Sequence, residues 1–287
     1  MAVGVFAVSL SGPLMAAMVV PPLAIAFWRN AFATLGLAPA ATLRRREELG
    51  ALRGRTLVLV GAAGAALAVH FATWVTALTL TSVASATAIV CLQIVWVVAW
   101  QLIVGERFGV GVVAGLVLAL AGVLVVSGVD LRVSARAVAG DVLALVGGVA
   151  AAAYMLIGAR ARQALSTTMY TFVCYGSCSL LLLVACLVAG QDLGGYPLSQ
   201  WGLLLLVTVT AQLLGHSVFN HLLATTAPMV VSLALLLEVP GAAVLAALIL
   251  GQVPPWEAVV GLVVMVAGMA LVIVHNRAAG IAEAPVD

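Results

Sequence analysis

Val230 to Leu250 reads VVSLALLLEVPGAAVLAALIL, a run of twenty-one residues with one charged side chain, Glu238. A helix of this length rises about 30 Å, which matches the hydrocarbon core of a bilayer. A stretch so long and so apolar is typical of a membrane-spanning helix. The fold prediction therefore starts from a helix that crosses the membrane with a carboxylate near its middle.

Nine other stretches of similar character are separated by charged residues or by Pro and Gly. They are Val3–Val19, Pro22–Ala40, Thr56–Val75, Ser82–Val104, Phe108–Val126, Val142–Ala159, Met169–Ala189, Trp201–Ala224 and Trp256–Val274. No basic residue precedes the first stretch, so we interpret it as a retained span and not a signal peptide. The true start of the protein can lie upstream of Met1. The sequence thus predicts ten spans.

The composition agrees with a membrane protein and excludes several functions. Of 287 residues, 65% are hydrophobic and 8% are charged, whereas soluble domains carry roughly 25% charged residues. The twelve basic residues are all arginine, so a Walker A site and a lysine-bound retinal are both excluded within this chain. The net charge of +2 gives no reason to expect a nucleic-acid partner. The four cysteines lack metal-ligand spacing, and we expect neither a metal nor a cofactor.

The arginines predict the orientation of the spans. Nine fall on the side that holds both termini: Arg44, Arg45, Arg46, Arg53, Arg55, Arg107, Arg160, Arg162 and Arg277. Arg132 and Arg136 fall on the opposite side, and Arg29 lies within a span. By the positive-inside rule, we expect both termini in the cytoplasm of a cell whose inner membrane holds the protein.

The chain contains an internal repeat. A shift of 146 positions aligns His70–Val126 with His216–Val272 without a gap, and 14 of 57 pairs are identical. Gly105, Gly115 and Gly122 fall on glycines of the second copy, and His70 falls on His216. Five spans per copy is an odd number, so the second copy would enter the membrane upside down, as in many secondary transporters. Chance similarity between two valine- and leucine-rich stretches is the alternative.

The predicted fold class is therefore all-α integral membrane, with ten transmembrane helices in two inverted five-helix repeats. The expected organisation is a first repeat over 1–126, an outer (periplasmic) connection over 127–140, a second repeat over 141–275 and a cytoplasmic tail over 276–287.

Three short elements resemble the EamA family of the drug/metabolite transporter superfamily. They are Phe27-Trp28-Arg29-Asn30 in the second span, Gly105-Glu106-Arg107 followed by Gly115 and Gly122, and Leu237-Glu238-Val239-Pro240 followed by Gly251-Gln252. Gln252 replaces a residue that is usually acidic in the family, and Val239 separates a Glu and a Pro that are often adjacent. The resemblance spans nearly the whole chain. It implies ten helices and transport of small metabolites, often the efflux of amino acids or related compounds.

Two charged residues, Glu238 and Arg29, lie well inside predicted spans. A charge in lipid costs about 2.5–3.5 kcal/mol on insertion scales, so each is a candidate for function. Glu238 is predicted to carry protons or to pair with a substrate amino group; the alternative is a hydrogen bond to a helix carbonyl that Pro240 leaves free. Arg29 lies about 10 Å below the Pro21-Pro22 corner. It is predicted to reach the outer interface, to hold a neighbouring helix, or to attract a substrate carboxylate.

Polar and aromatic side chains form a second group of candidates. His70 and Trp74 share a helix face because they are four residues apart, and His216 and Asn220 occupy the matching positions of the second copy. We interpret these four as walls of a common cavity; hydrogen bonding between helices is the alternative.

Gln93, Trp96, Tyr154 and Tyr175 are further lining candidates that could equally pack between helices. The predicted substrate-binding residues are therefore His70, Trp74, Gln93, Tyr154, His216 and Asn220, with Glu238 and Arg29 as the charged pair of the site.

The functional hypothesis is a secondary transporter that exposes a central site alternately to each side of the membrane. The expected substrate is a small amphipathic metabolite such as an amino acid, and export follows only from the resemblance. Expected partners are that substrate, protons and the lipid bilayer, with a monomer and a homodimer both open. Alternatives are import, uncoupled facilitated diffusion, and a lipid or polyprenyl-carrier flippase. An enzyme is not expected, because there is no HExxH and the adjacent His216 and Ser217 point in different directions.

Overall fold

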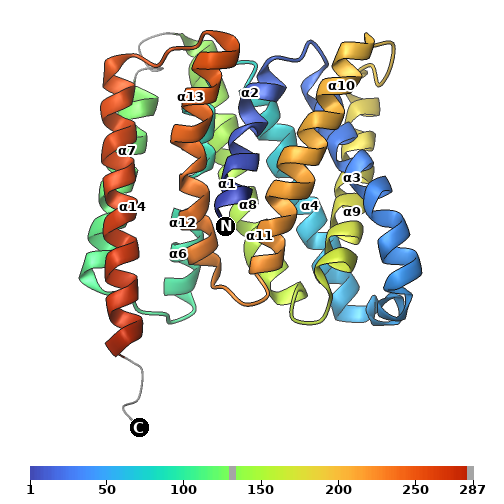
Figure 1. Ribbon diagram of the computed structural model, residues 1–287, viewed down its shortest axis with the longest axis horizontal. Helices are drawn as coiled ribbons and strands as arrows, with labels where there is room; N and C mark the ends of the chain where they lie inside the picture. Colours follow the sequence, from blue (N-terminus) through green and yellow to red (C-terminus); the bar gives the residue numbers. More distant parts are fainter. Residues whose placement is uncertain (129–133, 283–287) are drawn as a thin grey trace.

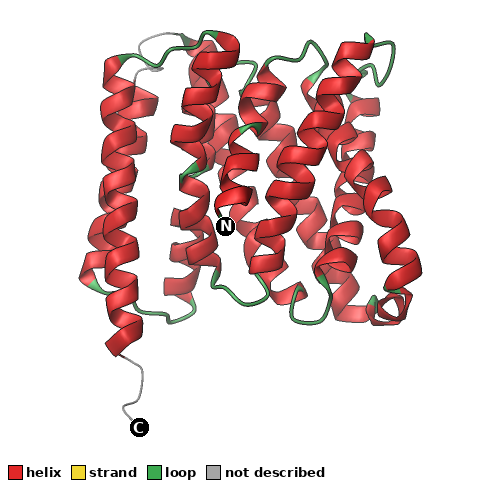
Figure 2. Ribbon diagram, viewed as in Figure 1, coloured by secondary structure: helices red, strands yellow, loops and turns green. Residues whose placement is uncertain are grey.

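A computed structural model describes residues 1–128 and 134–282, and over these ranges the chain is helical without strands (Figures 1 and 2). The helices of the first half are α1 (Ala2–Ser9), α2 (Ser11–Ala16), α3 (Pro22–Arg44), the 3-10 helix η1 (Arg46–Ala51), α4 (Gly54–Ala77), α5 (Val83–Val90), α6 (Gln93–Ile103) and α7 (Val110–Gly128). Those of the second half are α8 (Ala135–Ala161), α9 (Thr167–Val188), α10 (Leu198–Val207), the π-helix η3 (Thr208–His216), α11 (Ser217–Leu222), α12 (Pro228–Leu236), α13 (Glu238–Leu250) and α14 (Trp256–Ala282).

Each predicted span coincides with a helical segment, but the segments differ in length and polarity. Seven are long and apolar enough to cross a membrane. These seven are Gly54–Ala77, Val83–Ile103, Ala135–Ala161, Thr167–Val188, Leu198–Leu222, Pro228–Leu250 and Trp256–His275. Ala2–Ala16 and Val110–Val126 are shorter apolar helices, and α3 is the remaining segment. The protein is therefore a multi-pass membrane protein in which at least these seven helices have the dimensions of a span.

The helix that carries Glu238 is interrupted close to Pro240, although the sequence predicts one span over Val230–Leu250. Pro240 lacks an N–H, so the carbonyl of Leu236 loses its usual helical partner. The structure ends α12 at Leu236 and starts α13 at Glu238, with Leu237 N donating to Ala234 O at 3.2 Å. Glu238 consequently lies at an interruption halfway along this segment.

Paired glycines bring α7 and α14 into close contact. A Cβ added to Gly122 would lie 2.5 Å from the carbonyl oxygen of Gly261, and one added to Gly268 would lie 2.6 Å from that of Gly115. Both distances are too short for any side chain, so glycine is required for this approach. The lower-numbered glycine of α7 meets the higher-numbered one of α14, so the two helices run antiparallel, side by side in Figure 1.

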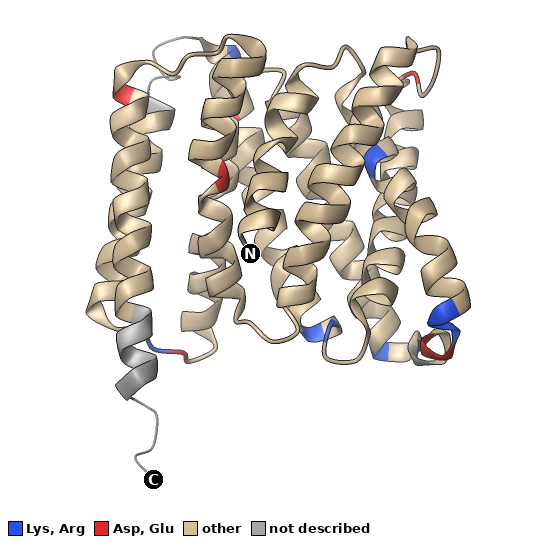
Figure 3. Ribbon diagram, in the orientation of Figure 1, with Lys and Arg blue, Asp and Glu red and all other residues tan. Residues whose placement is uncertain are grey.

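Charged residues collect at the ends of the bundle (Figure 3). Following the chain from helix to helix, one end holds the corner between α3 and α4, the loop between α6 and α7, and the end of α8. These carry Arg44, Arg45, Arg46, Arg53, Arg55, Arg107, Arg160 and Arg162. Arg136 lies at the opposite end, where its Nη2 donates to Thr79 O at 2.9 Å. Arg132 lies outside the described residues, as do 129–133 of the expected outer connection and 283–287 of the expected tail.

Candidate functional site

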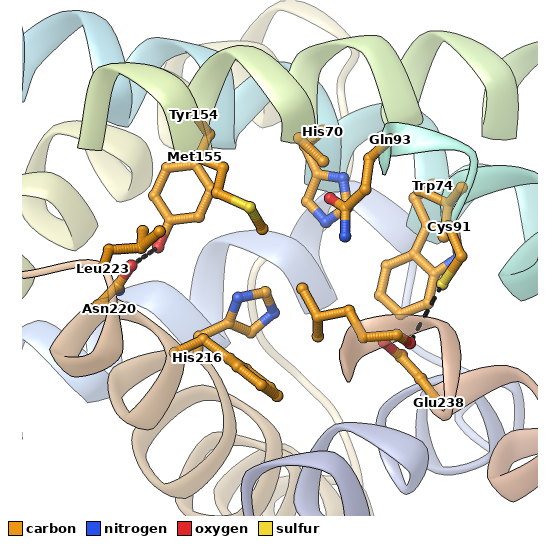
Figure 4. A pocket seen from close by; sticks show the side chains of 14 residues that line it. His70, Trp74, Cys91, Gln93, Tyr154, Met155, His216, Asn220, Leu223 and Glu238 are labelled. Atoms are coloured by element: carbon orange, nitrogen blue, oxygen red, sulfur yellow. Dashed lines mark hydrogen bonds between the residues drawn. The ribbon is translucent and has the colours of Figure 1, made fainter. Parts of the chain in front are cut away.

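A small cavity lies at the centre of the bundle, between segments from both halves of the sequence (Figure 4). Its volume is about 40 Å³, which holds a few water molecules. It is lined by His70, Trp74, Val90, Cys91, Gln93, Ala151, Tyr154, Met155, His216, Phe219, Asn220, Leu223, Leu235 and Glu238. The structure therefore brings together all six residues of the predicted binding set, together with Glu238.

The two repeat-related histidines face each other across this cavity. The ring centroids of His70 and His216 are 6.4 Å apart. His70 stacks on Trp74 at 5.7 Å with an interplanar angle of 16°, as expected from their spacing of four residues on α4. The Nδ1 atom of His70 lies 3.0 Å from the carbonyl oxygen of Gly147 on α8. A hydrogen bond between helices thus fixes one ring, while the same histidine lines the cavity.

Tyr154 and Asn220 form the polar wall at one end of the cavity. The Tyr154 hydroxyl donates to Asn220 Oδ1 at 2.5 Å, and Asn220 Nδ2 donates to the hydroxyl of Tyr175 at 3.2 Å. Tyr175 in turn donates to Gln212 O at 3.4 Å. That carbonyl belongs to the π-helix, where helical hydrogen bonds run to the fifth residue and not the fourth. Tyr175 thus supports Asn220 from behind instead of lining the cavity.

This polar wall is connected to the arginine-rich end of the bundle. Arg162 follows α8, and its Nε donates to the backbone oxygen of Asn220 at 3.0 Å. Its guanidinium also donates to Leu165 O and, at 2.9 Å, to Thr167 Oγ1. Burial lowers the pKa of this guanidinium, and Tyr170 and Glu48 oppose that shift. The corner between α8 and α9 is thereby tied to the helix that carries Asn220.

Glu238 lines the cavity from the start of α13 and is 8% exposed. Within the described residues its carboxylate makes no hydrogen bond and no ion pair. The alternative role, a hydrogen bond from a protonated Glu238 to a freed helix carbonyl, stays a prediction. Nearby, Cys91 donates its thiol to the carbonyl oxygen of Leu235 at 3.6 Å, drawn as a dashed line in Figure 4. The carboxylate is thus available to a group that enters the cavity.

Arg29 does not line the cavity but lies behind its wall. It is 0% exposed, which rules out the expectation that its side chain reaches the outer interface. Its Nε donates to Gln212 Oε1 at 2.9 Å and its Nη1 to Ser11 Oγ at 3.1 Å. The guanidinium lies 4.2 Å from the ring centroid of Phe71, whose own ring centroid is 5.4 Å from that of His216. One phenyl ring therefore separates this cation from a cavity-lining histidine.

The structure corrects a second lining candidate besides Tyr175, and it adds others. Trp96 is 41% exposed on the outside of the bundle, because α5 ends at Val90 and α6 restarts at Gln93, which changes the helical phase. Cys91 and Met155 line the cavity but were not expected there. Gln212 was also missed, although a polar residue inside a span, four positions before His216, is the signal that could have identified it.

The lining can bind an amphipathic molecule. Polar groups come from His70, Gln93, His216, Tyr154, Asn220 and Glu238, and mostly apolar surface from the remaining side chains. The indole nitrogen of Trp74 is buried and makes no hydrogen bond to a described residue, so it can donate to a bound molecule. Ligand pockets usually measure about 300–1,000 Å³, far more than the present cavity. A metabolite therefore fits only after the surrounding helices move apart.

Comparisons with known proteins agree with this architecture. The model of the EamA-like transporter family matches residues 1–128 and 138–274. No curated protein matches the chain. A solved structure titled only "Crystal structure of protein" superposes with a TM-score of 0.73 at 19% identity, covering 96% of each chain. At that identity the likeness concerns the fold alone.

Proposed function

The chain belongs to the EamA-like transporter family, and from this premise we propose that it is a secondary transporter that exports amino acids or related amphipathic metabolites by alternating access. The central cavity is the observation that carries the proposal. Six polar or aromatic residues and one carboxylate, contributed by both halves of the sequence, surround one enclosed space at the middle of the bundle. A binding site in that position can open to either side of a membrane.

The proposed architecture is ten transmembrane helices in two inverted repeats, with the boundaries 1–126, 127–140, 141–275 and 276–287. Under the shift of 146 residues, Gly115 is equivalent to Gly261 and Gly268 is equivalent to Gly122. The contacts Gly115–Gly268 and Gly261–Gly122 are therefore equivalent contacts of the two repeats. The contact between His70 and His216 converts into itself. These are the relations expected from a two-fold axis, and the antiparallel course of α7 and α14 supports an axis in the membrane plane.

Helix contacts support the same symmetry. α3 packs on α9, which is its equivalent in the second copy. α4 packs on α8. η3, the equivalent of part of α4, packs on α1, which is the equivalent of the middle of α8. We assign the arginine-rich end of the bundle, and with it both termini, to the cytoplasmic side of the cell's inner membrane, because arginine concentrates on that side.

Alternating access follows from the size of the cavity. A space of about 40 Å³ excludes an amino acid, so the two halves must separate on one side before a substrate enters. Coupling to the proton gradient is assigned to Glu238, because a carboxylate that lines the cavity can exchange a proton in each open state. Uncoupled facilitated diffusion is the alternative, and it requires no change at Glu238 during transport.

Flux into proteoliposomes tests the proposal. Purified protein is reconstituted into vesicles. Uptake of radiolabelled leucine, methionine, tryptophan, threonine and glutamate is then measured one amino acid at a time, with and without a pH gradient. We expect saturable flux of at least one amino acid above empty vesicles, and faster flux with the gradient. Flux equal to that of empty vesicles for the whole panel would remove the proposed function.

A lipid or polyprenyl-carrier flippase is the second candidate, because a groove of about 590 Å³ opens between α1, α12, α13 and α14. Leu237 lines this groove and the next residue, Glu238, lines the cavity. For this candidate, the helix break would be the place where a lipid headgroup passes from the groove to the cavity. Translocation of fluorescent lipid analogues in the same vesicles, without amino-acid flux, would favour this candidate.

A further inference from the structure

Arg29 is a buried cation with an unused donor. Its contacts within 3.3 Å are neutral: Gln212, Ser11 and the sulfur of Met15. Its Nη2 atom makes no hydrogen bond to any described residue. A buried charge without a counter-ion is strongly unfavourable, and a guanidinium is shaped to bind a carboxylate through two parallel hydrogen bonds. The surroundings of Arg29 therefore lack the one group that this side chain binds best.

Glu238 is the nearest candidate counter-ion but is not in contact with Arg29. The two side chains interact electrostatically, yet the ion pair found among the described residues is Arg45–Glu48, at the surface. Glu238 lines the cavity, whereas Arg29 lies behind Phe71 and His216. The site thus holds an anion and a cation, both buried and held apart by the cavity and one aromatic ring.

We propose that Arg29 is the carboxylate subsite of the transporter and that its substrates are zwitterions. The substrate ammonium would lie against Glu238, and its carboxylate would contact Arg29 once the Phe71 ring turns aside. The apolar lining between the two poles then accommodates an uncharged side chain. This inference rests on the proposed transport function and narrows it from amphipathic metabolites to molecules with both charges.

The alternative occupant of Arg29 is Glu238 itself, in a conformation where the two side chains pair. The two possibilities predict different results when Arg29 is replaced by a neutral residue. A substrate subsite loses its preference for a carboxylate when Arg29 is neutralised, whatever residue is present at position 238. An internal ion pair instead leaves that preference unchanged, and the double neutral variant restores the flux lost in each single variant.

The test uses competition, so that passive entry of neutral amines does not interfere. The probe is the radiolabelled amino acid with the highest flux in the panel, and the competitors are the same amino acid unlabelled, its amide and its amino alcohol. In the wild type we expect the amino acid to inhibit at concentrations roughly 10- to 100-fold lower than the other two, the range typical of a charged hydrogen bond. In Arg29→Gln we expect all three competitors to become nearly equivalent.

Two control variants keep the result interpretable. Arg29→Lys keeps the charge and should keep part of the preference, which also covers the case where Arg29→Gln fails to fold. Arg136→Gln removes an arginine at one end of the bundle, where its Nη2 donates to Thr79 O away from the cavity, and should leave the preference intact. Equal inhibition by all three competitors in the wild type, an unchanged preference in Arg29→Gln, or rescue by the double variant would each overturn the inference while transport stands. Absence of flux in the wild type would instead remove the proposed function.

Discussion

The hydroxyl of Tyr154 makes the shortest hydrogen bond of the side chains that line the cavity. It donates to Asn220 Oδ1 at 2.5 Å, and Asn220 is held from its backbone by Arg162. Tyr154→Phe removes a hydroxyl of the cavity lining that a polar substrate can bind, and the loss of such a hydrogen bond to a substrate costs about 1–3 kcal/mol. We expect substrate affinity to fall by roughly 5- to 100-fold with little loss of folded protein, measured as the KM of flux. Tyr170→Phe is the matched control, because Tyr170 does not line the cavity, and its KM should stay at the wild-type value.

Glu238 gives a second prediction at this scale. Other titratable groups near it are Cys91, His70, His216 and Tyr154 in the cavity lining, with Arg29 behind it. Glu238→Gln is nearly isosteric, so the protein should fold and its melting temperature should change little. If the carboxylate carries the coupled proton, acceleration of flux by a pH gradient disappears in the variant. A gradient effect equal to that of the wild type would assign Glu238 a structural role.

Site residues could be predicted from the sequence where the same residue type occupies equivalent positions of the two repeats. His70 and His216 were identified because they share a repeat position, and the structure brings their rings together. Cys91 and Met155 could not be identified in that way, because their types are as common in apolar packing as in a site. The burial of Arg29 depended on how closely α2, α4 and η3 approach, which no local pattern reports.

At the scale of helices, the contact between α7 and α14 depends on its glycines. A Cβ at position 122 would lie 2.5 Å from backbone atoms of α14, which have no freedom to withdraw. We expect Gly122→Ala to destabilise the protein by about 1–3 kcal/mol, measured by thermal unfolding in detergent.

Gly61→Ala is the control for this prediction. Gly61 lies in α4 with nothing within 4 Å of an added Cβ, and alanine favours a helix by up to about 1 kcal/mol over glycine. Its melting temperature should stay level or rise. A rise of similar size in Gly122→Ala would mean that the two helices are not packed as described.

The irregular helices differ in how well their breaks and bends can be predicted from the sequence. The break between α12 and α13 is predictable because Pro240 removes a donor. The π-helix η3 is not, because its equivalent α4 is a regular helix and no breaker residue distinguishes the two. The bend between α5 and α6 was also missed, and the misplacement of Trp96 follows from it.

On the scale of the whole molecule, the two ends of the bundle must face opposite sides of the membrane. Gly50, Gly109 and Gly194 are exposed, with open space around an added Cβ. Gly50→Cys and Gly109→Cys lie at the arginine-rich end and Gly194→Cys at the other. A membrane-impermeant maleimide applied to intact cells should label only position 194, and all three after permeabilisation. Labelling of 50 or 109 in intact cells would contradict the proposed orientation.

An odd number of spans per repeat predicts that the two halves are inverted, and the antiparallel course of α7 and α14 agrees with that prediction. What the sequence could not supply is the degree of closure, since the cavity volume depends on side-chain packing from five segments. In the present conformation the helices pack closely around the cavity and leave a volume of about 40 Å³.

Cys91 provides the most direct test that this cavity is where substrate binds. It is prepared as the only thiol, with Cys174, Cys178 and Cys186 replaced by Ala, and its alkylation by N-ethylmaleimide is timed with and without a transported amino acid. A variant whose only thiol is Gly194→Cys serves as the control. The account predicts slower alkylation of Cys91, half-maximal near the KM of flux, and no effect at position 194. An alkylation rate at Cys91 that ignores a substrate the protein demonstrably transports would contradict it.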